Sequence, residues 1–316
     1  MDPVALDRAV QTAAAIPGMR SLLIARHGEL VSESYFNGVT KDSIQDVRSV
    51  TKSFTSALVG IALREGLLQS TEQTVGELLG GIAPDMSPEW SAVTLDDLLT
   101  MRAGHDWHEI PGPSEFNEWV LSPNQVEYVL AKEIVSQPGT RFNYSDGSAH
   151  LVAVALAEAA GMPLPDFAGT YLFAPMGIAP RVWLADQQGY AYGGVALYLT
   201  GRDMLALGQL YLDGGLHDGV QVVPADWVAR STASQTSTRD AVPYGTDYGY
   251  YWWSGSAHGH DYYFANGYGG QFIVVVPDLD LVVTAACTWW STGGHASEYW
   301  YRVITVIMEE IIPAAR

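Results

Sequence analysis

The chain of 316 residues contains one cysteine, Cys287, and only three lysines. Both scarcities limit the kinds of site and partner that the chain can have. A single cysteine can form no intramolecular disulfide and supplies no cysteine-based metal site. Lysine and arginine together number 16 against 35 acidic residues, which gives a formal net charge of -19. A surface this acidic disfavours nucleic acid and anionic membranes as partners.

Long apolar runs are also missing. No uninterrupted apolar segment approaches the roughly 18 residues that a membrane-spanning helix needs, so no membrane insertion is predicted. Residues 1–18 lack the basic start and the continuous apolar core of a signal peptide. We therefore expect a cytoplasmic location, although a chain that had lost its leader would show the same sequence.

What the chain does contain is material for a large core. Hydrophobic residues make up 48% of it, with 10 tryptophans and 17 tyrosines, enough for one large domain or two closely packed ones. The predicted elements change from strands to helices and back to strands. They are a short helix ending near Gly18, two strands within 21–38 joined at His27-Gly28, a helix from Ser49 to Leu67, helices between 67 and 240, strands between 246 and 289, and a helix from Ser297 to Ile312 before Pro313.

This order of elements predicts an α+β fold. Strands near both termini indicate one antiparallel sheet, flanked by the N- and C-terminal helices, with a mostly helical subdomain inserted between its two halves. We expect residues 1–66 and 241–316 to form the sheet subdomain and residues 67–240 the helical one. A cleft between two such layers is the natural place for an active site.

Ser49 and Lys52 stand at the start of the helix that is expected from Ser49 to Leu67. Side chains at i and i+3 lie on one face of a helix, so the lysine amine can take the proton of the serine hydroxyl. The unpaired N–H groups of the helix start also favour developing negative charge there. In the ordinary alternative, Ser49 merely caps the helix and Lys52 is a surface residue.

Two later segments have polar or glycine-rich turns. Residues 143–147, Asn-Tyr-Ser-Asp-Gly, precede a helix expected from Ser148 to Ala160, and a tyrosine in such a turn is by itself ordinary. Residues 266–271, Asn-Gly-Tyr-Gly-Gly-Gln, lead into a strand, whereas a phosphate-binding loop would lead into a helix. Their glycines indicate either a bend entering an edge strand or backbone amides left open to a substrate.

Taken in chain order, these segments resemble the three signatures of the serine β-lactamase and penicillin-recognising superfamily. The similarity covers nearly the whole chain, lies closest to the class C-like branch, and is strongest to family VIII carboxylesterases and 6-aminohexanoate-oligomer hydrolases. It implies a β-lactamase/transpeptidase-like fold and a serine hydrolase. The matching segments are Ser49-x-x-Lys52, Tyr144-Ser145-Asp146, Gly267-Tyr268-Gly269-Gly270-Gln271, and the stretches 95–104 and 272–283.

The resemblance also implies roles for single residues. Ser49 would attack a carbonyl and form an acyl-enzyme. Either a neutral Lys52 takes the serine proton, or a charged Lys52 lowers the pKa of Tyr144, whose phenolate takes it. The backbone N–H groups of Ser49 and Gln271 would form an oxyanion hole. The residues implied to contact substrate are Asp146, Tyr268, Gly269, Gly270 and Trp107.

Two positions depart from the pattern of the superfamily. Lactam-processing members usually carry Lys-Thr-Gly in the third signature, where the cation holds the substrate carboxylate. Here Tyr268, Gly269 and Gly270 stand in that place, with no positive charge. The second signature usually ends in asparagine, and here it ends in Asp146. Both departures favour small esters or unstrained amides over β-lactams.

No cofactor or metal is predicted. His105 and His108, and the cluster at 258–261, are spaced as metal ligands can be, but loop histidines in an acidic protein are more often solvated. The absence of Gly-x-Ser-x-Gly disfavours an α/β-hydrolase.

Three functions remain open at the level of sequence. The first is a serine hydrolase of small esters or amides, including linear 6-aminohexanoate-type oligomers. The second is a penicillin-binding D-alanyl peptidase or a β-lactamase, against which the missing third-signature lysine counts. The third is a non-catalytic binding module of the same fold, which would need neither Ser49 nor Lys52 nor Tyr144. The sequence does not specify the oligomeric state.

Overall fold

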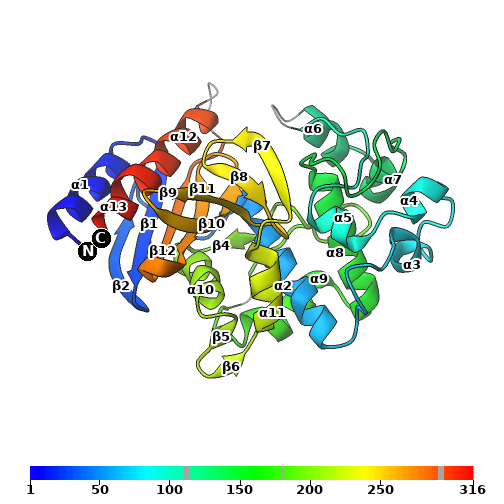
Figure 1. The fold of residues 1–316 in the computed structure, drawn as a ribbon, viewed down its shortest axis with the longest axis horizontal. Coiled ribbons are helices and arrows are strands. Elements are labelled where there is room, and N and C mark those ends of the chain that lie inside the picture. The colour runs from blue at the N-terminus through cyan, green and yellow to red at the C-terminus, as the bar shows by residue number, and fades with distance from the viewer. Residues whose placement is uncertain (110–113, 180, 291–294, 316) are drawn as a thin grey trace.

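An eight-stranded antiparallel sheet is the largest sheet among the described residues (Figure 1). The computed structural model of the chain describes residues 1–109, 114–179, 181–290 and 295–315. The strand order is β2-β1-β12-β11-β10-β9-β8-β7, so strands from the two ends of the chain, β1 and β12, are neighbours in the sheet. The strands are β1 (Met19–Arg26), β2 (Glu29–Tyr35), β7 (Thr236–Val242), β8 (Gly245–Tyr248), β9 (Trp253–Ala257), β10 (His260–Gly267), β11 (Gln271–Val276) and β12 (Leu281–Cys287).

The N-terminal hairpin forms as predicted. His27 and Gly28 both adopt positive φ, 53° and 72°, which suits the tight turn that joins β1 to β2. β1 also pairs antiparallel with β12, with Leu22 opposite Ala285, and so adds the start of the chain to its last strands. The α+β class expected from the sequence is confirmed.

Helices cover both faces of the sheet. Phe272 of β11 packs on Trp300 of α12 (Ala296–Val306), with ring centroids 5.7 Å apart. The next residue, Ile273, faces α10 (Gly201–Leu212), where a Cβ at Gly208 would lie 2.8 Å from Ile273 Cγ2. Because successive side chains of a strand point to opposite faces, α12 and α10 lie on opposite sides.

The two termini lie side by side on the α12 face (Figure 1). α1 (Pro3–Ala14) begins with Asp2 as its cap, and the Asp2 N–H donates to Ala314 O over 2.8 Å. The last helix continues past the stop predicted before Pro313, through a π turn at Ile307–Ile311 into α13 (Ile312–Ala314). Pro313 lies in the first turn of α13, where a missing N–H leaves no hydrogen bond unmade.

The boundary between the two parts differs from the one predicted at residue 240. α10 packs on β1, β11 and β12, and β7 already begins at Thr236, so both belong with the sheet. Helical periodicity shows that α10 has an apolar face, but it does not show which neighbour that face contacts. α10 and β7 thus pack with the sheet, whereas residues 67–240 as a whole were expected to form the helical subdomain.

The helical part is built around α8 (Asp146–Ala160), which packs on α2 (Thr51–Arg64) and on α5. Residues 51–62 of α2 are all buried. No single helix among the described residues is long and apolar enough to cross a membrane; Asp146–Ala160 and Leu164–Phe173 reach that length only as a pair bent by 75°. The other helices are α3 (Val75–Leu79), α4 (Pro88–Ser91), α5 (Leu95–Leu99), α6 (Ser114–Val120), α7 (Gln125–Leu130), α9 (Leu164–Ala168) with a π turn at Gly169–Phe173, and α11 (Ala225–Thr232).

Two short two-stranded sheets complete the fold. β3 (Gln45–Asp46) pairs with β4 (Tyr198–Leu199), and β5 (Leu216–His217) pairs with β6 (Val220–Gln221). The first pair leads directly into the turn at Arg48–Val50 that precedes α2. That turn contacts β10 and β11, while α2 contacts α8, so Ser49 lies where the sheet and the helical part meet.

Candidate active site

Ser49 lies in a 3-10 turn, Arg48–Val50, that runs directly into α2. The turn is held by hydrogen bonds from Val50 N to Val47 O (3.2 Å) and from Thr51 Oγ1 to Arg48 O (2.6 Å). One helical turn later, Lys52 Nζ donates to Ser49 Oγ over 3.1 Å. The structure thus brings together the two groups that the i, i+3 spacing predicted, with Ser49 half-buried and Lys52 only 1% exposed.

Lys52 is surrounded by oxygen atoms. Its ammonium forms an ion pair with the Asp146 carboxylate and donates to Gly194 O over 3.2 Å. A Cβ at Gly194 would lie 2.2 Å from Asp146 Oδ1, so only glycine leaves room for this pair. Burial alone would lower the pKa of Lys52, but the charges of Asp146, Tyr144 and Glu109 outweigh burial and raise that pKa above its usual value. Lys52 is therefore charged at neutral pH.

Tyr144 forms the wall of the site beside Lys52. Its ring stacks on Trp253 of β9, with centroids 5.7 Å apart, and Lys52 Nζ lies 4.6 Å from the centre of the Tyr144 ring. Tyr144 is only 8% exposed. Burial raises the pKa of its hydroxyl to about 12, although the Lys52 charge acts in the opposite direction.

The second motif is anchored by the loop before it. Ser145 caps α8, because its Oγ accepts from Ser148 N over 3.0 Å, and His105 Nε2 lies 3.0 Å from the same oxygen. Asn143 Nδ2 donates to the carbonyl groups of His105 (3.2 Å) and Trp107 (3.0 Å). These contacts fix Tyr144 and Asp146 on either side of Ser145.

Glu109 is a site residue that the sequence did not reveal. Its Oε2 accepts from Asp146 N and from Trp107 Nε1, each over 2.9 Å. Burial, followed by the Asp146 charge, raises the pKa of Glu109 well above its usual value. Trp107, which the resemblance placed among the substrate contacts, is 1% exposed, so it supports Glu109 from behind the site. Nothing in the spacing of residues 105–109 could have indicated this contact with α8.

The third motif is the turn between β10 and β11. A Cβ at Gly267 would lie 2.6 Å from Val47 O, which shows how closely this turn approaches the segment before Ser49. Gly269 and Gly270 have φ of 81° and 99°, values that favour glycine, and Gly269 abuts Trp289. Tyr268 is 46% exposed. β11 is a central strand, so the alternative of a bend entering an edge strand was wrong in that detail.

Gln271, the predicted second oxyanion donor, is positioned by its own side chain. Gln271 Nε2 donates to Cys287 O over 2.7 Å, and Cys287 N donates to Gln271 Oε1 over 3.2 Å. Gln45 Nε2 lies 3.3 Å from the same Oε1. This double contact fixes β11 against the end of β12 and thereby fixes the backbone of Gln271.

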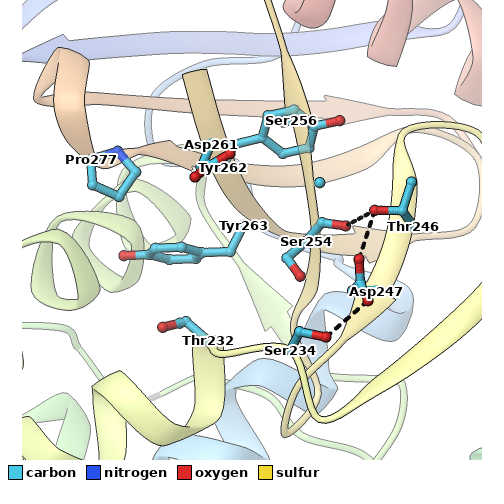
Figure 2. Close-up of a pocket in the computed structure, with 11 residues that line it drawn as sticks. Thr232, Ser234, Thr246, Asp247, Ser254, Ser256, Asp261, Tyr262, Tyr263 and Pro277 are labelled. Carbon is cyan, nitrogen blue, oxygen red and sulfur yellow. Dashed lines mark hydrogen bonds between the residues drawn. The ribbon is translucent and has the colours of Figure 1, made fainter. Parts of the chain in front are cut away.

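A separate cavity of about 380 Å³ opens beside β8, β9 and β10 (Figure 2). Hydroxyl groups dominate its wall, and Ser234 and Thr246 donate to Asp247 there over 2.8 and 2.9 Å. None of its lining residues is a predicted site residue. Ser254, which lines it, follows Trp253 in β9, and alternation along the strand turns Ser254 away from the face that carries Trp253 and Tyr144.

Comparison with known proteins agrees with this architecture. Residues 6–306 match the model of the family described as Beta-lactamase. The chain belongs to the beta-lactamase family. The fold and the class of enzyme that the three motifs implied are thereby confirmed: the chain is a serine hydrolase of the β-lactamase-like kind.

Individual relatives differ in what they are named for. The chain is 24% identical to the 6-aminohexanoate-dimer hydrolase of Paenarthrobacter ureafaciens over 294 residues, which cover 85% of this chain and 72% of that protein. The structure of EstCE1, a hydrolase with promiscuous acyltransferase activity, superposes with a TM-score of 0.73 at 16% identity and covers 95% of this chain and 98% of that one. A penicillin-binding protein from Bacillus halodurans gives a TM-score of 0.73 at 15% identity, with coverage of 95% and 98%.

His105 should make the fold sensitive to acid. Burial lowers its pKa to about 4, whereas an unfolded histidine titrates near about 6.5, so the unfolded chain binds more protons at intermediate pH. Stability should fall as the pH drops from 6.5 toward 4, and His105 should account for about 2 kcal/mol of that loss at about pH 5. Urea unfolding at pH 7.5 and 5 should show a smaller loss for His105→Gln than for wild type. His217→Gln, at a partly exposed histidine, is the control and should lose as much stability between pH 7.5 and 5 as wild type. A loss in His105→Gln equal to that of wild type would contradict the role of His105 in the acid sensitivity.

Proposed function

We propose that Ser49 is the nucleophile of a hydrolase that cleaves small esters or amides through an acyl-enzyme. The observation that carries this proposal is the contact of 3.1 Å between Lys52 Nζ and Ser49 Oγ, inside a cluster that also holds Tyr144 and Asp146. A buried ammonium in contact with a half-buried serine hydroxyl is an arrangement that helix capping alone does not require. It is the arrangement that proton transfer from a nucleophile needs.

The pKa shifts of Lys52 and Tyr144 bear on both candidate acceptors of the Ser49 proton. A lysine whose pKa is raised holds its proton at neutral pH and cannot accept another one. The same charge lies 4.6 Å from the Tyr144 ring and opposes the effect of burial on the pKa of the phenol. Burial also raises the pKa of Tyr144, to about 12, so Tyr144 too must lose its proton before it can take that of Ser49, and the Lys52 charge is what favours its phenolate.

The oxyanion would be held by the backbone N–H groups of Ser49 and Gln271. Support comes from the packing of the β10–β11 turn against the Arg48–Val50 turn, which brings both backbone segments together. The side-chain contacts of Gln271 with Cys287 keep its backbone in place before the substrate arrives. Such preorganised donors typically contribute about 3 kcal/mol each to acyl transfer.

The substrate class follows from what the site offers. The third motif, Tyr268-Gly269-Gly270, places an exposed phenol and two glycines where lactam-processing relatives usually have Lys-Thr-Gly. This favours esters and unstrained amides, and the relative named as a 6-aminohexanoate-dimer hydrolase supports linear amides as candidates. A β-lactamase or D-alanyl peptidase is the second candidate, supported by the penicillin-binding relative.

Replacing Ser49 by alanine should abolish hydrolysis of a short-chain 4-nitrophenyl ester. It should also abolish the covalent mass increase produced by a fluorophosphonate, because the alanine variant has no hydroxyl to displace fluoride and form the phosphonate ester. Mass spectrometry of the intact protein provides the readout. Ser56→Ala, at a buried serine of α2, is the control and should label normally. Labelling that persisted in Ser49→Ala would place the nucleophile elsewhere.

A panel of three substrates should separate the candidate functions. We expect turnover of the 4-nitrophenyl ester or of a 6-aminohexanoate dimer, and none of a chromogenic cephalosporin, because no cation stands in the third motif. Initial rates measured spectrophotometrically, and by chromatography for the dimer, provide the comparison. Turnover of the cephalosporin alone would favour a β-lactamase or D-alanyl peptidase. No turnover of any of the three substrates would favour a non-catalytic binding module.

Asp146→Asn should move the acidic limb of the pH–rate profile to lower pH. The Asp146 charge raises the pKa of Lys52 and of Tyr144, so its removal lowers both, and a base with a lower pKa becomes active at lower pH. Stopped-flow acylation rates between pH 5 and 10 measure the shift. Asp186→Asn, at a buried carboxylate paired with His150 in the helical part, is the control. A limb that stayed in place or moved upward would contradict the proposed cluster.

A further inference from the structure

Arg48, the residue before Ser49, has a strained backbone. Its φ is 52°, in the left-handed region that a non-glycine residue rarely adopts without a reason. Asp46 holds this conformation, because its Oδ1 accepts from Arg48 N over 2.8 Å and from Ala196 N over 3.2 Å. Backbone strain of this kind is found most often at functional sites.

The Arg48 guanidinium lies between two aromatic rings. Its Cζ is 4.4 Å from the ring centre of Trp289 and 5.2 Å from that of Phe116. Trp289 is the second residue after the end of β12 and abuts Gly269 of the third motif, whereas Phe116 belongs to α6 of the helical part. The guanidinium thus connects the nucleophile's turn, the third motif and the helical part.

Most hydrogen-bond donors of this guanidinium have no acceptor among the described residues. A guanidinium has five N–H donors, and among the described residues its side-chain acceptor is Asp46, 3.3 Å from Nη1. Arg48 Nε is buried and has no hydrogen-bond partner among the described residues. The side chain is 15% exposed, so part of it can be reached from solvent. Stacking on aromatic rings fixes the plane of a guanidinium and leaves its edge free to bind an anion.

We propose that Arg48 binds a carboxylate of the substrate and thereby makes this enzyme selective for esters or amides that carry one. The class includes half-esters of dicarboxylic acids and linear amides with a free carboxyl end. The inference rests on the proposed function, in which Ser49 attacks the substrate carbonyl. It gives the site a cation over the ring of Trp289, the residue that contacts Gly269 in the motif from which the expected lysine is missing. Arginine suits this task because its paired N–H groups match both carboxylate oxygens.

Two pairs of esters test the proposal, one for each side of the scissile bond. On the acyl side, 4-nitrophenyl adipate half-ester is compared with 4-nitrophenyl hexanoate, in which a methyl group replaces the carboxylate. On the leaving-group side, 3-acetoxybenzoate is compared with 3-tolyl acetate. In wild type, kcat/KM should favour the anionic member of at least one pair. That preference ratio should fall at least tenfold in Arg48→Met and less in Arg48→Lys.

Controls separate failure of this inference from failure of the proposed function. Arg230→Met removes another arginine stacked on aromatic rings, Trp227 and Tyr250, and should leave the ratio within twofold of wild type. If Arg48→Met does not fold, wild type provides the test: added salt should lower kcat/KM for the anionic ester only, and free adipate or 3-hydroxybenzoate should inhibit competitively.

A ratio near one in wild type for both pairs, or a ratio that Arg48→Met leaves intact, would overturn the role of Arg48 even if Ser49 is the nucleophile. Neutral-ester hydrolysis that survives in Ser49→Ala would instead overturn the proposed function.

Discussion

The buried ion pair between Lys52 and Asp146 is the interaction on which the site depends. It joins the first turn of α2 to the first turn of α8, with exposures of only 1% and 3% for the two side chains. Removing one member of such a pair leaves an uncompensated buried charge, which typically costs about 3–5 kcal/mol. The pair therefore fixes where the helical part meets the nucleophile, and Gly194 is needed to leave room for it.

A second carboxylate, Glu109, shares the same ammonium. Two buried carboxylates cannot both be balanced by one lysine, and the raised pKa of Glu109 means that it keeps a proton to higher pH than an exposed glutamate. Asp146 is the carboxylate in contact with Lys52, whereas Glu109 accepts from the Asp146 N–H. Lys52 already forms an ion pair with Asp146, so in the proposed mechanism its ammonium acts on Ser49 and Tyr144 and not on an anionic substrate group.

Local features could be predicted from the sequence, and contacts between distant segments could not. The His27-Gly28 turn and the Ser49–Lys52 spacing follow from backbone geometry within a few residues. The packing of α10 on the sheet and the contact of Glu109 with α8 join segments far apart in the chain, and periodicity carries no information about either. Asp146 was noted as a departure from the superfamily's asparagine, but only the structure shows it as the counter-ion of Lys52.

Because Arg48 directly precedes Ser49, the proposed carboxylate-binding cation and the nucleophile belong to one short segment of backbone. Arg48 and Ser49 belong to one 3-10 turn, which Asp46 and the hydrogen bond of Thr51 hold rigid. If the guanidinium binds a substrate carboxylate, its contacts with Trp289, Phe116 and Asp46 hold that anchor in place relative to the attacking oxygen. Fixing both ends of a substrate in this way converts binding energy into alignment of the carbonyl, the form in which binding most effectively accelerates a reaction. A lysine in the third motif would act across two segments of chain, whereas Arg48 acts within one.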